Sequence, residues 1–233
     1  MKRIATAAVV GANGKVGSAL VRALPKAGVR IVPPERAQLI LLAVPDRAVK
    51  QVASALHADP EQLVAHLAGA LDLEVLAPAR RRGSIHPLRA FTGGEDFRGA
   101  AAGIAASSAG GRAQLADLAR RLGMTPLPVR GRRALYHAAA VLAAGAQVAL
   151  FNEAVDVFRQ ATGATVASAR AALLPLALGA LQQGGITGPA VRGDQQTIAA
   201  HRKALPAKQR TLYDLLTRAM LEHARRQRPR HRP

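Results

Sequence analysis

The stretch of sequence that decides the fold is Ile4–Gly28, which reads IATAAVVGANGKVGSALVRALPKAG. Small and β-branched residues fill Ala5–Val10, which predicts a short strand. Glycines at positions 11, 14 and 17 predict a tight turn after it, because glycine adopts backbone conformations that other residues avoid. Apolar residues then recur at helical spacing, at Val16, Leu20, Val21 and Leu24. The stretch therefore predicts a strand, a glycine turn and a helix in succession.

A turn of this kind can bind a phosphate group. Glycine has no Cβ atom, so backbone amides can approach a ligand closely, and the start of a helix carries partial positive charge. The spacing GxxGxxG is one residue longer than the dinucleotide motif GxGxxG, so it matches a variant of that motif. A glycine turn without any ligand is the alternative. As a cofactor site, the turn would hold a pyrophosphate with Gly11, Ala12, Asn13, Gly14, Lys15, Val16 and Gly17.

Composition excludes several classes of site. Cysteine is absent from the 233 residues, which rules out disulfides, a thiolate nucleophile and cysteine metal sites, and which fits a cytoplasmic protein. Residues 138–151 and 171–181 are apolar but are interrupted by Gln147 and Pro175, so we expect no membrane span. A secretory signal is also disfavoured, because the apolar run after Lys2 and Arg3 is short and lacks a cleavage pattern.

The formal charge of +19 is concentrated in arginine clusters at 80–82, at 130–133 and in the tail over 225–232. Such a balance can indicate nucleic acid. However, the sequence shows no aromatic stacking run, zinc finger or helix-turn-helix pattern. An arginine-rich composition with a solvated basic tail over residues 228–233 is therefore the favoured interpretation. The same charge favours a phosphorylated cofactor.

One element of a dinucleotide fold is missing near the second strand. Val29–Val32 predicts that strand, and the sequence Pro33-Pro34-Glu35-Arg36 then leads almost at once into the apolar strand Gln38–Val44. A helix usually connects these strands, and the second strand usually ends in a residue that contacts the ribose. Glu35 or Arg36 remains a candidate for that contact, although the two prolines restrict the backbone before them.

The remaining elements predict two domains with a boundary near residue 130. Asp46 is placed to cap a helix over Arg47–Leu56. Further strands and helices are expected at Leu63–Leu67, Asp72–Arg82 (helix), Ser84–Leu88, Ala102–Ala106, Gly111–Gly123 (helix) and Thr125–Val129. Long helices follow at Arg133–Thr162, Thr165–Gln183, Asp194–Leu205 and Ala207–Arg226. The fold class is thus α/β, with a Rossmann-like doubly wound parallel sheet over 1–130 and an all-α domain over 131–227.

Histidines are the candidate catalytic residues. His66 and His86 fall at the carboxyl ends of predicted strands, where α/β sheets bind ligands, and His137 begins the long helix. An imidazole can protonate a carbonyl oxygen, so His86 or His137 is a candidate general acid. Structural roles for these histidines, and for His201, are the alternative. No HxH or HxxxH spacing occurs, so no metal site is predicted.

Other polar residues are candidates for substrate binding. Thr187-Gly188-Pro189 predicts a turn, and Asp194 a helix cap, which leaves Arg192 free to bind a carboxylate. Asn152 lies seven residues after Gly145 and therefore on the same helical face. Tyr136 can donate a proton or simply pack its ring.

Six motifs occur in an order that resembles a known bacterial family: the glycine turn, AVPD at 43–46, His66 before GAL at 69–71, HPL at 86–88, ALYHAAAV at 134–141, and TGPAVRGD at 187–194 followed by His201. The family has a Rossmann-like N-terminal half and a helical domain catalogued as DUF2520. It is similar in plan to pyrroline-5-carboxylate reductases, ketopantoate reductases and 6-phosphogluconate-type dehydrogenases.

The resemblance implies NADP, or NAD with slightly less preference, on the first domain, with Ala43, Val44 and Pro45 beside the nicotinamide. It also implies a small-molecule substrate in the cleft against the helices and a homodimer, which we expect to form through the helical domain. His66, Asn152, Thr187 and Arg192 are the residues that we predict to bind this substrate.

The chain departs from the family pattern in ways that matter for chemistry. Leu67-Ala68 stands where the family tends to carry Thr-Ser, and Ala144-Gly145 where it tends to carry Ser-Asn. Both changes remove hydrogen-bonding side chains. The leading hypothesis is an NAD(P)-dependent oxidoreductase acting on a small carbonyl or imine acid. The alternative is a Rossmann scaffold without redox activity that binds another ligand or a protein partner.

Overall fold

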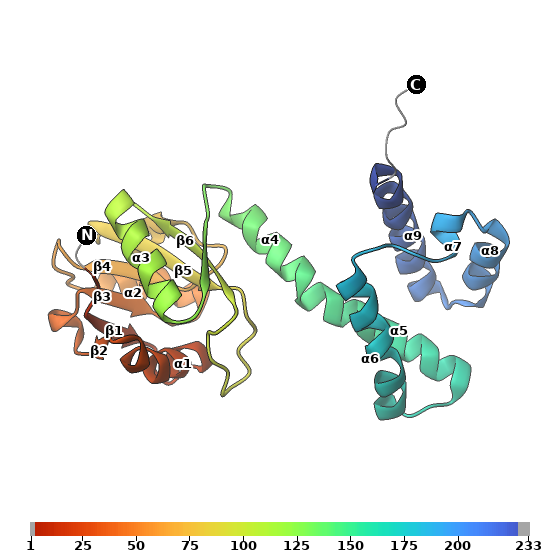
Figure 1. Cartoon of the computed structure of the whole chain (residues 1–233), viewed down its shortest axis with the longest axis horizontal. Coiled ribbons are helices and arrows are strands. Elements are labelled where there is room, and N and C mark those ends of the chain that lie inside the picture. Colours follow the sequence, from red (N-terminus) through yellow and green to blue (C-terminus); the bar gives the residue numbers. More distant parts are fainter. Residues whose placement is uncertain (1–2, 228–233) are drawn as a thin grey trace, which may run out of the picture. The chain divides into compact units, whose positions relative to one another are not determined.

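The computed structural model describes residues 3–227, and the predicted basic tail at 228–233 lies outside them. The chain divides into two compact units, Met1–Leu142 and Ala143–Pro233. The first contains the sheet with its helices and most of α4 (Arg133–Ala143), and the second is helical (Figure 1). The α/β class is confirmed. The domain boundary near residue 130 stays a prediction.

The first unit is built on a seven-stranded sheet in the order β2-β1-β3-β4-β5-β6-β7. Its strands are β1 (Thr6–Val10), β2 (Arg30–Ile31), β3 (Leu39–Leu42), β4 (Leu63–His66), β5 (Arg81–Pro87), β6 (Ala101–Ala106) and β7 (Thr125–Pro128). Neighbours are parallel except β5 and β6, which are antiparallel. The expected parallel sheet is therefore found at every neighbouring pair except this one. No helix crosses between β5 and β6, and a parallel connection needs such a crossover.

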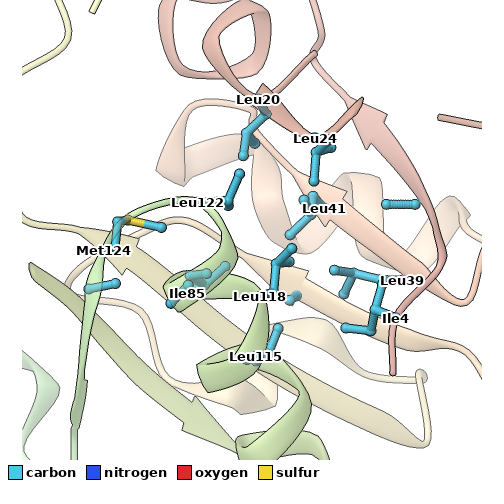
Figure 2. Close-up of a cluster of buried hydrophobic side chains, with 14 of the residues drawn as sticks. Ile4, Leu20, Leu24, Leu39, Leu41, Ile85, Leu115, Leu118, Leu122 and Met124 are labelled. Carbon is cyan, nitrogen blue, oxygen red and sulfur yellow. The ribbon is translucent and has the colours of Figure 1, made fainter. Parts of the chain in front are cut away.

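One face of the sheet packs against α1 (Lys15–Ala23) and α3 (Ala109–Arg121). Leucines of the two helices meet Leu39, Leu41 and Ile85 from the strands, as Figure 2 shows. All four side chains of β3 are buried, as expected for a strand covered on both faces. The aromatic-poor composition thus still yields a continuous core of leucine, isoleucine and alanine.

The other face is covered by α2 (Asp46–Ala55), by the 3-10 helix η3 (Leu73–Leu76) and by the first turns of α4. Two expectations are wrong here. Asp46 is the first residue of α2 instead of its cap, because Pro45 occupies the N-cap position. The expected helix over Asp72–Arg82 is only η3, since Pro78 interrupts it and β5 already begins at Arg81.

Gln62 holds the short connection between β2 and β3 in place, where a crossover helix would usually lie. After β2 the chain forms the short 3-10 helix η2 (Pro34–Arg36) and enters β3. Gln62, which is 8% exposed, donates from Nε2 to the carbonyl oxygens of Pro34 and Ala37 at 2.7 Å each. Gln62 directly precedes β4, so η2 lies at the edge of the sheet where the parallel strands begin.

The second unit consists of helices α5 (Gly145–Thr162), α6 (Val166–Gln183), α7 (Pro189–Arg192), α8 (Gln195–Ala204) and α9 (Ala207–Gln227). The single helix expected over 133–162 is divided, because Ala144 leaves helical geometry at φ −121° and ψ −81°. These residues are together long and apolar enough, by length and composition alone, to cross a membrane. The cap by Asp194 is confirmed: its Oδ1 accepts from the amide of Thr197 at 3.0 Å.

Replacing Gln62 tests whether its two hydrogen bonds stabilise this connection. We expect Gln62→Leu to lower the free energy of unfolding by about 1 to 3 kcal/mol, because two carbonyl groups lose their donor in a buried place. Urea denaturation would measure the change. Gln51→Leu, on the exposed side of α2, is the matched control and should stay within about 0.5 kcal/mol of the wild type. Equal effects of the two variants would contradict this role for Gln62.

Candidate functional site

The ends of four parallel strands form one edge of the sheet. Val10 pairs with Leu42, Leu42 with His66, and His66 with Ser84. The residues that follow in each strand therefore lie in one row: the glycine turn, Ala43–Pro45, the loop 67–69 and His86. Three strand spacings of about 4.8 Å separate the first from the last, or roughly 14 Å. The register thus brings the predicted cofactor residues and His86 to the same edge.

The glycine turn is shaped by close backbone contacts. A Cβ atom on Gly17 would collide with the carbonyl of Gly11, and one on Gly11 would collide with the carbonyl of Ala43. Gly11 also has a φ of +88°, a conformation that favours glycine. The turn is closed by a hydrogen bond from the Gly14 amide to the Gly11 carbonyl at 3.0 Å. These two glycines are required by the packing of β1, β3 and α1.

The start of α1 is open to an anion. Gly14 is its N-cap, no side chain caps the helix, and its first turn contains no acidic residue but does contain Lys15. Gly11, Asn13, Gly14 and Lys15 are exposed, whereas Ala12 and Val16 are half-buried and Gly17 is buried. Amides without acceptors at a helix start, beside a lysine, suit a phosphate group. The predicted pyrophosphate residues therefore fit such a group, and their role stays a prediction.

The candidates for the ribose lie elsewhere. The carbonyl of Arg36 accepts from Thr6 Oγ1 at 3.5 Å, at the start of β1, and Pro34 is bonded to Gln62 before β4. Glu35 and Arg36 are therefore at the edge of the sheet opposite to the glycine turn. Their contact with a ribose on that turn is not supported.

Two histidines and a tyrosine meet around Gly69. The rings of His86 and His137 lie edge to face with centroids 5.8 Å apart, and a Cβ on Gly69 would touch both. His86 Nδ1 lies 2.9 Å from the Tyr136 hydroxyl. Gly103 on β6 leaves the space that this hydroxyl occupies. The structure therefore brings together His86 and His137, the two predicted catalytic residues, and adds Tyr136 to them.

His86 is held neutral by its surroundings. Burial, followed by the charges of His137 and Arg133, lowers the pKa of His86 to about 4. Burial raises the pKa of Tyr136, so its hydroxyl keeps its proton at neutral pH. Tyr136 is thus a suitable donor to Nδ1 of a neutral His86, which would leave the imidazole proton on Nε2. Nε2 is the ring nitrogen that faces Gly69.

His66 lies deeper than expected for a substrate ligand. Its ring is fully buried in the sheet, and neither nitrogen has a hydrogen-bond partner among the described residues. Burial first, and then the charge of Arg133, lowers its pKa to about 4, although backbone groups of Asp72 and Ala68 act in the opposite direction. A substrate has no access to the ring in this structure.

Arg133 is a site residue that sequence reasoning did not find. It is the first residue of α4, is 4% exposed, and donates from Nη2 to the Ala68 carbonyl and to Ser84 Oγ, both at 2.8 Å. In the sequence, Arg133 belongs to an arginine cluster whose other members, Arg130 and Arg132, are exposed. Its position one helical turn before His137 was the available signal.

The other predicted substrate residues belong to the second unit. Asn152 on α5 is exposed, and its Oδ1 accepts from Arg170 Nη1 at 2.7 Å. Thr187 is exposed before α7, and Arg192 is the exposed last residue of α7. His201 pairs with Tyr213 at 2.9 Å. Substrate contacts by Asn152, Thr187 and Arg192 stay predictions. Within the described residues, 3–227, no group of three or more histidine, aspartate or glutamate side chains could hold a metal ion.

Family models match both parts of the sequence. A model of a Rossmann-like domain matches residues 30–90, and a model of the domain of unknown function DUF2520 matches residues 100–220, which is more than half of the chain. The chain belongs to the DUF2520 family. No curated protein matches its sequence.

Solved structures share the fold of this DUF2520 protein. A protein from Bacteroides fragilis described as a candidate NADP oxidoreductase is 21% identical with a TM-score of 0.75, and covers 94% of this chain and 98% of its own. Protein TM1727 from Thermotoga maritima has the same identity and TM-score, with 96% and 99% covered. The pyrroline carboxylate reductase of Plasmodium falciparum, solved with NADP bound, is 11% identical with a TM-score of 0.57, and 96% of each chain is covered.

The buried neutral histidines predict an acid-sensitive fold. Their pKa is about 4 in the folded state and about 6.5 when unfolded, so between these values the unfolded chain binds more protons. We expect the free energy of unfolding to fall as the pH is lowered from 6.5 to 4, by up to about 1.4 kcal/mol per pH unit for each histidine. Urea titrations at several pH values would measure this slope.

Two variants separate this effect from the protonation of carboxylates. His86→Gln removes one of the two groups and should reduce the slope in that interval, whereas His57→Gln, on the exposed surface, should leave it unchanged. An identical slope in wild type and His86→Gln would contradict the neutral state of His86.

Proposed function

We propose that this DUF2520 protein is an NAD(P)-dependent oxidoreductase that reduces the carbonyl or imine group of a small acid. One observation carries the proposal. The register of the parallel strands places the uncapped glycine turn and His86 at the same edge of the sheet, and Tyr136 and His137 of α4 lie against His86 there. The structural neighbours named as NADP oxidoreductase and pyrroline carboxylate reductase, at 21% and 11% identity, support a nicotinamide cofactor.

The turn residues would hold the pyrophosphate, and Ala43, Val44 and Pro45 would lie beside the nicotinamide, which supplies hydride when bound. NADP is the preferred form in this proposal. The second strand is followed by Val32 and Pro33 in place of the acidic residue that binds a ribose hydroxyl in NAD sites. Lys15 in the first turn of α1 adds positive charge for a phosphate.

The histidine cluster would stabilise the reacting group. Tyr136 donates to Nδ1 of His86, and the Nε2 proton of His86 then points toward Gly69 and can donate to a carbonyl oxygen or imine nitrogen. His137 shares this position and is the second candidate donor. Arg192, Thr187 and Asn152 are proposed to bind the acid group of the substrate, and His66 to support the loop that carries Gly69.

The departures at Leu67 and Ala68 favour a second candidate function. Without the hydroxyl groups that the family tends to carry there, the same scaffold would bind a ligand or a protein partner with no redox chemistry. Cofactor binding together with turnover of a carbonyl or imine acid would exclude this alternative.

We further propose a cytoplasmic homodimer formed through the helical unit. Large apolar side chains are exposed on α5 and α6: Val148 58%, Leu176 71%, Leu178 49% and Leu181 61%. The apolar residues of α6 surround the helix, which is typical of a helix buried on all sides. A second copy of the chain would cover such a surface.

A single substitution in the turn separates fold from cofactor binding. Gly14→Asp places a preferred N-cap residue at the start of α1, where φ is −71° and ψ 165°. We expect the free protein to gain a few tenths of a kcal/mol, whereas NADPH binding should be lost because the carboxylate occupies the amides and repels phosphate.

Thermal shift with NADPH and NADH measures both effects. NADPH at a hundred times its dissociation constant should stabilise the wild type by about 2.7 kcal/mol, and it should leave Gly14→Asp unchanged. Gly14→Ser is the uncharged control and should retain binding. No response of the wild type to either nucleotide at millimolar concentration would exclude the redox proposal.

The proposed donors are tested by turnover. We expect His86→Gln and His137→Gln to lower the rate of NADPH oxidation with a panel of small oxo acids and cyclic imines by about 10²-fold or more. The NADPH dissociation constant should stay the same, because neither residue lies on the glycine turn. His223→Gln, on α9, is the control. Full activity in both variants would remove these residues from the mechanism.

The dimer is tested by light scattering after size exclusion. We expect the wild type at twice the chain mass of 24.3 kDa and Leu176→Lys at the chain mass. Arg170→Lys on the same helix is the control and should remain dimeric. A monomeric wild type at micromolar concentration would contradict the dimer.

A further inference from the structure

Arg133 is a buried cation without an anionic partner. The residue is 4% exposed, and its Nε and Nη1 atoms are closed to solvent and have no hydrogen-bond acceptor. No carboxylate among residues 3–227 forms an ion pair with it. A group enclosed in this way cannot contact a ligand. Any part that Arg133 takes in the chemistry must therefore act through the residues that it touches.

The third guanidinium nitrogen joins two segments of the site to the start of α4. Nη2 donates to the Ala68 carbonyl and to Ser84 Oγ, both at 2.8 Å, and Ser84 is itself fully buried. Ala68 directly precedes Gly69, and Ser84 lies two residues before His86 on β5. Side chains two residues apart on a strand point to the same face, so Ser84 and His86 both face α4.

Arg133 is also linked to His137 through α4. It is the first residue of that helix, and His137 follows four residues later, about one turn along and on the same face. The ring of His137 lies against Gly69 and against His86, with the two ring centroids 5.8 Å apart. A shift of Arg133 away from β5 would therefore move His137 relative to His86.

We propose that Arg133 is the positioning residue of this site, where its two hydrogen bonds fix Gly69, His86 and His137 against one another. This role rests on the proposed function, in which the two histidines donate to the substrate. Donors act on a reacting group only when they are held in the right place, and a displacement of about 1 Å can cost about 10²-fold in rate. Arg133 supplies that rigidity from inside the fold.

The charge of Arg133 separates it from a residue with a purely structural role. The titratable and charged groups around His86 are Arg133, Tyr136 and His137 on α4 and His66 on β4. Burial first, and then the charges of His137 and Arg133, lowers the pKa of His86 to about 4. Loss of the Arg133 charge should raise this pKa, although burial and His137 continue to lower it.

Histidine titration by NMR tests the charge without any cofactor. In protein labelled with ¹⁵N-histidine, we expect Arg133→Met to raise the pKa of His86, and His86→Gln identifies the signal. Ser84→Ala keeps the charge and should leave the pKa near 4. Arg130→Met, the same change at an exposed arginine three residues earlier, is the matched control and should also leave it unchanged. An unchanged pKa in Arg133→Met would contradict the proposal.

Turnover tests the positioning. With the oxo acid or cyclic imine that the wild type reduces, we expect Arg133→Met to lower kcat about 10²-fold and to leave the NADPH dissociation constant unchanged. Ser84→Ala removes one of the two hydrogen bonds and should lower kcat by less. Arg133→Lys keeps the charge and a donor, so it should recover part of the rate and the low pKa of His86. Arg130→Met should retain the full rate.

The milder variants decide the matter where Arg133→Met does not fold. A lower kcat in Ser84→Ala, with the His86 pKa and the NADPH dissociation constant unchanged, would then support the proposal. Wild-type kcat in Ser84→Ala together with Arg133→Lys, or a loss of NADPH affinity at unchanged kcat in any of these variants, would overturn it. Absence of turnover in the wild type would overturn the redox function, whereas the titration would still show whether Arg133 acts on His86.

Discussion

The first unit depends on close backbone contacts at two glycines, where no side chain could fit. Gly17 on α1 lies against the carbonyl of Gly11, and Gly11 lies against the carbonyl of Ala43 at the end of β3. Any Cβ atom at either position would push α1 away from the sheet. Because the helix is held this close, its free amides lie beside the residues that follow β3. The packing that closes the core thus also positions the amides that we propose to bind a phosphate group.

The elements near the glycine turn could be predicted because they are specified locally. The sequence itself shows the turn glycines, the continuous apolar run of β3 and the lack of a crossover helix before it. The direction of β6 is not, since a short alanine-rich strand pairs equally well in either sense and its partner is chosen by the connecting loop. The end of α4 at Ala143 could not be predicted either, because the alanine and glycine residues there show no periodic pattern.

The candidate site was predicted in part for the same reason. His86 and His137 are chemically conspicuous, and the sheet register together with α4 brings them around Gly69. The burial of Arg133 depends on Ala68 and Ser84, which are far from it in sequence. One arginine among several in a charged cluster gives no sign of being the buried one. Tertiary contacts decide this, and a single sequence does not display them.

The reversal of direction between β5 and β6 places the loops that follow the strands at both margins of this sheet. In a sheet of uniform direction, every strand would deliver its loop to one margin, and the opposite margin would carry only returning helices. Here β1, β3, β4 and β5 end on one side, and β6 and β7 end on the other. Arg133 and His137 lie one turn apart at the start of α4, where Arg133 is bonded to Ala68 and Ser84 and His137 lies against Gly69. One helical turn thereby fixes the positions of a buried cation and of the imidazole that lies against His86.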